Sequence, residues 1–326
     1  MGRGAMVDAQ TQALVNQLSA GVTAAVFTPA RKDGCIDIDA LADYSSRLAS
    51  SGLAGLAVWA HTGRGLRLDR RCRKIVIDTI RQATTLPLVA GVGVPSEVKV
   101  ADTNEGIAAT VAMAHAAGES GADALMVYPP AFAAGQGVAE RASTVRRIHS
   151  AVAALGLPVL GFLLYERAGG VSYRDAELAE ILCIDGVVGM KVATLDQAIR
   201  CQDALATIAS AGKLAVTGED RMFGPSLMWG AQTSIVGIAA GVPHLTIEVQ
   251  QAWQNGDTKR FIAASHRLDA FSARIFGEPR DGYIQRMMWA AVGSGLLPAE
   301  FAHDPYGGPN KEDEKESLIS YVRSIG

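Results

Sequence analysis

The chain has 326 residues and a mass of 34.1 kDa, which suits one large α/β domain or two modest ones. Hydrophobic residues make up 49% of it and charged residues 19%, so it can bury a large core and is not expected to be disordered. The net charge of −3 and the pI of about 6.1 provide no basic surface for nucleic acid or an anionic membrane, and neither is an expected partner.

The sequence predicts a soluble, cytoplasmic protein. Every apolar run is interrupted before the roughly 20 residues that span a bilayer, and the polar segment 1–12 lacks the order of a signal peptide. The cysteines are far apart and form no C-x-x-C pair, so we expect reduced, mostly buried thiols rather than zinc or redox chemistry. They are Cys35, Cys72, Cys183 and Cys201.

In chain order, short apolar runs alternate with longer segments of helical spacing, which is typical of β-α units around a parallel sheet buried on both faces. The runs that predict strands are 22–28, 55–61, 88–92, 124–128, 159–165, 187–192, 214–217 and 234–239. The segments that predict helices between them are 38–50, 70–83, 104–119, 138–154, 174–182 and 195–209.

Eight such units within about 250 residues predict a (β/α)8 TIM barrel. A doubly wound open sheet is the alternative, but it would usually carry a G-x-G-x-x-G turn after the first strand, where this chain reads T-P-A-R-K-D-G. Beyond Pro243 only helical patterns continue, at 248–253, 259–276, 283–292 and 313–325. We therefore expect an N-terminal extension (1–20), a barrel that carries the active site (21–243) and a C-terminal helical region (244–326).

The strongest candidate for a reactive group is Lys191, which ends the sixth apolar run. Reactive groups of a TIM barrel lie at the carboxyl ends of the strands, so this amine should point into the barrel mouth from apolar surroundings. Desolvation lowers the pKa of such an amine from about 10.4, which a Schiff-base nucleophile needs near neutral pH. The alternative is a lysine that merely extends to solvent.

Two more strand ends carry polar groups. Tyr165 ends the fifth run, beside the strand of Lys191, where a phenol can shuttle the protons that imine formation requires. A rim tyrosine bonded to the backbone is the alternative. After the second run, residues 61–65 read H-T-G-R-G, a turn whose Thr62 hydroxyl and backbone amides can hold a carboxylate, although most such turns only connect elements.

Other catalytic patterns are missing from the sequence. The six histidines show no metal-ligand spacing, and there is no G-x-S-x-G elbow and no Walker loop, so neither a metal nor a cofactor is expected. After the seventh run, Glu219 and Asp220 place carboxylates where a phosphate-binding barrel needs amides and positive charge. A phosphosugar isomerase is therefore not expected.

The order of these pieces resembles the dihydrodipicolinate synthase / N-acetylneuraminate lyase family of Schiff-base-forming lyases. The pieces are G-V-T-A-A-V-F-T-P at 21–29, T-G at 62–63, A-G-V-G at 90–93, G-A-D at 121–123, Y at 165, G-M-K at 189–191 and G-E-D at 218–220. The resemblance implies that Lys191 forms an imine with a 2-oxo acid, that Tyr165 relays protons and that Thr62 and neighbouring amides hold the substrate carboxylate. It also implies a homo-oligomer, either a dimer or a tetramer.

Departures from the family pattern bear on the substrate. The second loop, usually G-T-T-G-E or G-S-T-G-E, reads A-H-T-G-R at 60–64; the synthase's tyrosine after the fourth strand is absent from P-P-A-F at 129–132; and its substrate-gripping arginine would fall near Gly170. Dihydrodipicolinate synthase activity is therefore not expected. Aldol cleavage, condensation or dehydration of a 2-oxo-3-deoxy sugar acid fits better, and a non-catalytic 2-oxo acid-binding protein is the alternative.

The predicted substrate-binding residues lie in the loops at the same face. Two of them, Arg64 and Arg167, suit an extra carboxylate or a polyhydroxylated substrate, unless they are simply solvated. The full set is His61, Thr62, Gly63, Arg64, Arg167 and Val236.

Overall fold

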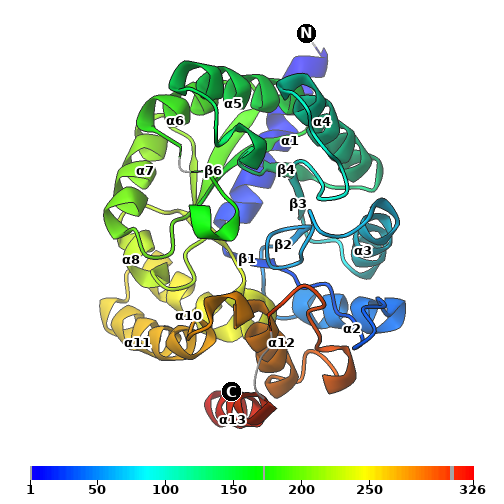
Figure 1. The fold of residues 1–326 in the computed structure, drawn as a ribbon. Coiled ribbons are helices and arrows are strands. Elements are labelled where there is room, and N and C mark those ends of the chain that lie inside the picture. The colour runs from blue at the N-terminus through cyan, green and yellow to red at the C-terminus, as the bar shows by residue number, and fades with distance from the viewer. Residues whose placement is uncertain (1, 172, 309–311) are drawn as a thin grey trace.

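The computed structural model describes residues 2–171, 173–308 and 312–326. Within them, eight parallel strands pair in sequence order and close into a barrel, with β1 beside β8, which confirms the predicted TIM barrel (Figure 1). The strands are Val22–Ala25 (β1), Gly55–Val58 (β2), Leu88–Val92 (β3), Ala124–Val127 (β4), Val159–Leu164 (β5), Val187–Ala193 (β6), Leu214–Thr217 (β7) and Thr233–Val236 (β8).

Helices occupy the connections and surround the barrel (Figure 1). Three of them begin directly after an aspartate, Asp37, Asp69 or Asp102, whose carboxylate accepts a hydrogen bond from an amide in the first turn. The helices of the ring are α2 (Ile38–Ala49), α3 (Arg70–Ala83), α4 (Thr103–Glu119), α5 (Val138–Ala153), α6 (Asp175–Leu182), α7 (Ala198–Ser210) and α8 (Phe223–Met228).

Alternate side chains of each strand face the barrel interior and the surrounding helices. Phe162, Val216 and Ile235 belong to the apolar cluster inside the barrel. Met190 and Val192 belong to the larger core between barrel and helices. Since the neighbours of Lys191 on both sides face outward, its side chain faces the interior.

The strands predicted at 22–28 and 55–61 end earlier, at Ala25 and Val58, and the helix predicted at 248–253 begins already at Pro243. Two further boundary errors fall where a carboxylate accepts a hydrogen bond from a backbone amide. The strand predicted at 234–239 ends at Val236, and a short helix, α9 (Ile238–Gly241), follows it. The amide of Ile238 donates to Asp220. The helix predicted to start at Leu195 starts at Ala198, because Leu195 adopts a left-handed φ of 56° and donates its amide to Glu219.

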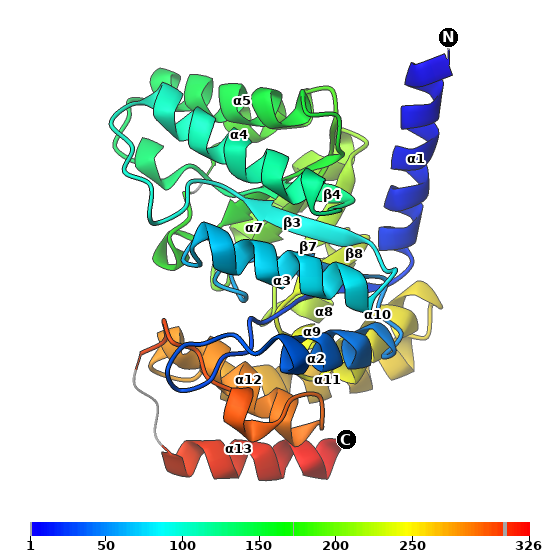
Figure 2. The ribbon, with the colours of Figure 1, turned by 90° about the vertical axis from the view of Figure 1, so that its right-hand side faces the viewer.

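The N-terminal extension forms a helix, α1 (Gly2–Ser19), which the sequence analysis did not predict. Its last turn covers the end of the barrel at which the strands begin, where Leu18 joins the interior cluster. The Leu18 carbonyl accepts a hydrogen bond of 2.6 Å from Thr233 Oγ1. From there α1 projects away from the barrel (Figure 2).

The predicted C-terminal helices are present, and one buried arginine links them. Arg286 donates to the carbonyls of Ile275, Gly277 and Pro279 at 3.2, 2.9 and 3.0 Å and pairs with Glu314 at 2.6 Å. It therefore ties the end of α11 to α12 and α13, and α13 lies outside α12 (Figure 2). The helices are α10 (Pro243–Gln254), α11 (Thr258–Ile275), α12 (Tyr283–Gly293) and α13 (Glu312–Ile325).

The expectation of mostly buried cysteines is wrong, although all four are free thiols. Only Cys201 is buried; Cys72 is intermediate, and Cys35 and Cys183 are exposed. The reason is local, since Cys35 lies in the loop after β1 and Cys183 follows the last turn of α6. Within the described ranges, no helix has both the length and the apolar character needed to cross a membrane.

Candidate active site

Lys191 is the amine inside the barrel mouth. On β6 it lies opposite Phe162 of β5 and Val216 of β7, and it is only 5% exposed. Its Nζ lies 4.4 Å from the centroid of the Phe162 ring. The side chain lines a cavity of about 50 Å³, which we call the Lys191 cavity. The predicted burial of this lysine among apolar groups is therefore present in the fold.

Burial lowers the pKa of Lys191 to about 8, and the negative charges of Asp220 and Glu219 oppose part of this shift. Among the described residues no carboxylate forms an ion pair with Nζ. At pH 7 roughly a tenth of such amines are neutral, against fewer than about one in a thousand for an ordinary lysine. Near neutral pH the site thus holds an amine with a larger neutral fraction than an ordinary lysine has.

The two carboxylates beside Lys191 are occupied with the backbone. Glu219 is buried and accepts from the Thr194 amide, from Thr194 Oγ1 at 2.8 Å and from the Leu195 amide at 2.9 Å, which fixes the loop after β6. Asp220 accepts from the Ile238 amide at 2.8 Å, and burial raises its pKa to about 6. No group of three or more His, Cys, Asp or Glu in the described part of the chain is arranged to hold a metal ion.

Tyr165 immediately follows β5, next to the strand of Lys191. Its amide donates to the Ala193 carbonyl at 2.9 Å, which joins the carboxyl ends of β5 and β6. Both Tyr165 and Lys191 line the Lys191 cavity. The structure thus brings together the two residues to which the sequence analysis gave catalytic roles.

The second loop reaches the same cavity through His61 and Thr62. The Thr62 side chain is buried. The amides of Gly63 and Gly65 donate to the Ala60 carbonyl at 3.0 and 3.4 Å, and the Arg64 amide donates to the His61 carbonyl. These three amides serve the turn itself, so the Thr62 hydroxyl is the polar group that the turn directs to the cavity wall.

Gly63 has a steric role in this loop. A Cβ on Gly63 would lie 2.7 Å from the Val26 carbonyl oxygen, too close for any other residue without a shift of the backbone. Gly63 therefore lets the second loop pack against the end of β1. This packing positions the neighbouring Thr62 at the cavity.

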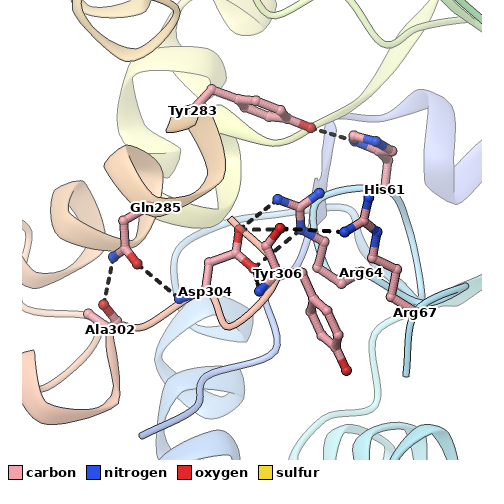
Figure 3. A network of polar contacts seen from close by, with 8 residues as sticks. All are labelled: His61, Arg64, Arg67, Tyr283, Gln285, Ala302, Asp304 and Tyr306. Atoms are coloured by element: carbon pink, nitrogen blue, oxygen red, sulfur yellow. Dashed lines mark hydrogen bonds and ion pairs between the residues drawn. The ribbon is translucent and has the colours of Figure 1, made fainter. Parts of the chain in front are cut away.

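Arg64 is largely buried, and its charge is paired with a carboxylate. Its guanidinium pairs with Asp304 at 2.7 Å, and the two side chains are 13% and 2% exposed (Figure 3). The backbone amide of Asp304 donates a hydrogen bond to Gln285 Oε1, which holds this aspartate in place on the C-terminal segment. Asp304 is thus a partner that sequence reasoning missed, since it lies far from Arg64 in the chain.

One other predicted binding residue, Val236, does not line the Lys191 cavity. Val236 is buried with its side chain in the core outside the barrel, because alternation along β8 turns it away from the interior, and Gly237 lines the cavity instead. Arg167 belongs to a short helix after Tyr165, η2 (Glu166–Ala168), and its side chain lies outside the described residues.

Sequence reasoning also missed Tyr283, the first residue of α12. Its hydroxyl lies 2.5 Å from His61 Nδ1 (Figure 3). Its ring stacks on Phe276 with the centroids 4.9 Å apart. Tyr283 and Phe276 both line the Lys191 cavity. A signal existed, since a tyrosine opens the helical pattern at 283, but only the packing of the C-terminal helices against the barrel mouth brings it to the site.

A second cavity, of about 460 Å³, adjoins the first, and we call it the large cavity. His61 and Leu164 line both cavities. Arg64 and Arg67 also line the large cavity, and its other lining residues are mainly apolar. It offers space for the part of a ligand that extends away from Lys191.

The sequence matches the Dihydrodipicolinate synthetase family over residues 18–325. The chain belongs to this family. Among its relatives, a 4-hydroxy-tetrahydrodipicolinate synthase of Methanothrix thermoacetophila is 26% identical over 85% of this chain and 90% of the relative. The "Probable 4-hydroxy-2-oxoglutarate aldolase, mitochondrial" of Emericella nidulans is 21% identical over 86% of this chain and 83% of the relative.

A solved structure has the same fold. It is YagE, a prophage protein of the dihydrodipicolinic acid synthase family from E. coli K12 in complex with pyruvate. The two chains superpose with a TM-score of 0.79 at 20% identity, over 94% of this chain and 98% of the other. The expected resemblance to this family, drawn from motif order, is confirmed.

A substitution at Gly218 tests how closely Lys191 is packed. A Cβ on Gly218 would lie 2.4 Å from Lys191 Cε, so Gly218→Ala should displace the amine while the flexible side chain spares the fold. We expect circular dichroism and thermal unfolding close to those of the unsubstituted chain. The rate at which pyruvate and borohydride form an adduct on Lys191 should fall at least about tenfold.

Gly135→Ala is the matched control, because a Cβ at Gly135 meets nothing within 4 Å. It should leave the adduct rate unchanged. An adduct rate in Gly218→Ala equal to that of Gly135→Ala would mean that Lys191 has more room than the structure gives it.

The lowered pKa of Lys191 predicts a pH profile. Only the neutral amine attacks a carbonyl, so the rate of trapping should rise with pH, about tenfold per unit at first, and level off near pH 8. Asp220→Asn removes a negative charge that raises this pKa, so the inflection should move to lower pH. Timed borohydride quenching with intact mass measures both profiles.

Asp203→Asn, an exposed position on α7, serves as the control for the loss of one carboxylate. Its profile should match that of the unsubstituted chain. An inflection above pH 9 in the unsubstituted chain, or no displacement in Asp220→Asn, would contradict the assigned electrostatics.

Proposed function

We propose that this chain is a Schiff-base lyase that acts on a 2-oxo acid through an imine at Lys191. The observation that carries the proposal is the buried amine of Lys191 near the carboxyl end of β6, with a pKa of about 8 and a cavity beside it. An imine on this amine, once protonated, acts as an electron sink for a bond that breaks two carbons away. Membership in a family that includes an aldolase and a synthase supports the same chemistry.

Tyr165 is the proposed proton relay. Formation of the imine requires proton transfer to the carbonyl oxygen, loss of water and return of a proton, and Tyr165 lines the same small cavity as the amine. The hydrogen bond of its amide to the Ala193 carbonyl fixes its backbone beside the end of β6. These contacts support the role that the resemblance implies.

We propose that Thr62 binds the carboxylate of the 2-oxo acid. Its side chain is buried and lines the Lys191 cavity, and Gly237 opposite it leaves room, since a Cβ there would lie 3.0 Å from Thr62 Oγ1. Arg64 is compensated by Asp304, so a second substrate carboxylate would meet the exposed Arg67 in the large cavity more readily. A 2-oxo-3-deoxy sugar acid remains the proposed type of substrate.

A trapping experiment tests the imine. Pyruvate and a panel of 2-oxo acids and 2-oxo-3-deoxy sugar acids are incubated with the chain, reduced with borohydride and examined by intact mass and peptide mapping. We expect a covalent adduct on Lys191 and none in Lys191→Ala. No adduct with any member of the panel, or an undiminished adduct in Lys191→Ala, would refute the proposed function.

Tyr165→Phe separates proton transfer from imine formation. It should fold, retain a reducible adduct on Lys191 and lose about 10²–10⁴-fold in turnover of the substrate found in the panel, the usual contribution of general acid–base catalysis. Lys191→Ala should abolish both. Turnover of Tyr165→Phe at the unsubstituted rate would show that this tyrosine is structural.

The second candidate is a 2-oxo acid-binding protein without turnover, which the altered second loop with His61 and Arg64 favours. Saturable binding in calorimetry, with neither an adduct nor a product, would support it. A cytoplasmic location, and small molecules rather than nucleic acid or membranes as partners, also remain predictions.

We also propose a homo-oligomer, which the resemblance to the family implies. Two large apolar side chains, Ile199 on α7 and Met228 on α8, are 74% and 62% exposed, which is compatible with further contacts. Light scattering at micromolar concentration should return a dimer or a tetramer. A single species of 34.1 kDa would contradict the proposal.

A further inference from the structure

His61 and Tyr283 form a polar pair at the junction of the two cavities. His61 Nδ1 lies 2.5 Å from the Tyr283 hydroxyl oxygen, and the two rings are parallel to within 2° (Figure 3). His61 lines both the Lys191 cavity and the large cavity, and Tyr283 lines the former. His61 is a predicted substrate-binding residue with no specific substrate atom assigned to it so far, and Tyr283 has no role in the chemistry described above.

The contacts of the pair define its protonation. Burial, with the charges of Arg64 and Lys191, lowers the pKa of His61 to about 3, so the ring is neutral and carries one N–H. The Ala168 backbone near the ring offsets only part of this shift. Burial raises the pKa of Tyr283 well above its usual value, so its hydroxyl keeps its proton. We therefore assign the Tyr283 O–H as donor to Nδ1 and place the ring proton on Nε2.

The two cavities share lining residues, and this limits where the carbon chain of a bound substrate can lie. An imine at Lys191 fixes C2 of a 2-oxo acid in the Lys191 cavity, with C1 directed to Thr62. The small volume leaves the rest of the chain to extend into the large cavity, and the residues common to both linings are His61 and Leu164. C4, two carbons from the imine, therefore lies beside His61, and Leu164 offers it no polar group.

We propose that His61 is the hydrogen-bond donor to the substrate oxygen on C4, and that Tyr283 is the positioning residue that holds His61 in the required tautomer. This inference rests on the proposed function. In aldol cleavage the C3–C4 bond breaks, its electron pair moves into an enamine, and the C4 hydroxyl becomes a carbonyl. The hydroxyl proton leaves through Tyr165 and ends on C3 of the enamine.

Negative charge develops on the C4 oxygen during this step, and in the reverse condensation as well. The Nε2–H of His61 stabilises that charge without giving up its proton, as a preorganised donor does in a water-poor site. A neutral imidazole acts in this way in triosephosphate isomerase. The substrate oxygen accepts from this N–H where the His61 ring lines the large cavity.

Two probes distinguish this role from imine formation. Pyruvate has no C4, so the exchange of its C3 protons in deuterium oxide reports Lys191 and Tyr165 alone. Cleavage is measured on the fastest substrate among 4-hydroxy-2-oxobutanoate, 4-hydroxy-2-oxoglutarate and 2-oxo-3-deoxygluconate. Each variant is characterised by kcat and KM for cleavage and by the rate of pyruvate exchange.

His61→Ala should lower kcat for cleavage by about 10²–10³-fold, the usual effect of one lost donor, with pyruvate exchange within about twofold of the unsubstituted rate. His61→Gln offers a neutral amide N–H and should recover part of kcat. Tyr283→Phe should lower kcat about tenfold or more at nearly unchanged KM, because the tautomer is no longer held while the ring still fills its place.

Tyr44→Phe is the matched control, since it also removes a buried hydroxyl, one that donates to the Ala240 carbonyl at 2.9 Å away from both cavity linings. It should keep kcat. The inference is overturned if His61→Ala cleaves at the unsubstituted rate, or if pyruvate exchange falls in step with cleavage. If the chain traps pyruvate on Lys191 but cleaves none of the three probes, the inference about His61 is also overturned, while the imine at Lys191 is retained. Failure to trap pyruvate refutes the proposed function itself.

Discussion

The site depends on one constraint, the burial of a primary amine inside an apolar barrel. Lys191 is the charged group that points into the interior cluster, and it has no carboxylate partner among the described residues. Its neighbours reduce the cost of burying the charged amine without forming an ion pair with it. The Phe162 ring lies near Nζ, and the carboxylates of Glu219 and Asp220 accept hydrogen bonds from backbone amides. A lysine paired with a carboxylate would keep its proton at neutral pH. A solvated lysine would have an ordinary pKa and would also stay protonated there.

The C-terminal region completes the mouth around this amine. Tyr283 and Phe276 form part of the wall of the Lys191 cavity, and Asp304 holds Arg64 of the second loop. Buried Arg286 on α12 binds the carbonyls at the end of α11, next to Phe276, and Gln285 of the same helix accepts from the Asp304 amide. The barrel therefore supplies the amine, and the helical appendix supplies the polar partners of the loop that faces it.

The sequence pattern predicts the bounds of those strands and helices that depend only on neighbouring residues in the chain. Strands β3 and β7 and helix α3 have the predicted bounds, since a short apolar run or a helical period with an aspartate cap is readable from consecutive residues. The misplaced boundaries after β6 and β8 arise from Glu219 and Asp220, which follow β7 and bind amides that follow the two neighbouring strands. The direction of Val236 likewise follows from the register of β8, which a run of apolar residues does not reveal.

The sequence by itself determined the barrel, the family, and the placement of Lys191 and Tyr165 at adjacent strand ends, because all of these follow from order along the chain and from alternation within strands. Only the tertiary structure decided the pKa of the amine, the compensation of Arg64 and the pairing of His61 with Tyr283. The residues of that pair are separated by 222 positions. Desolvation and contact depend on which surfaces pack together, and no local pattern encodes how the C-terminal helices dock on the barrel mouth.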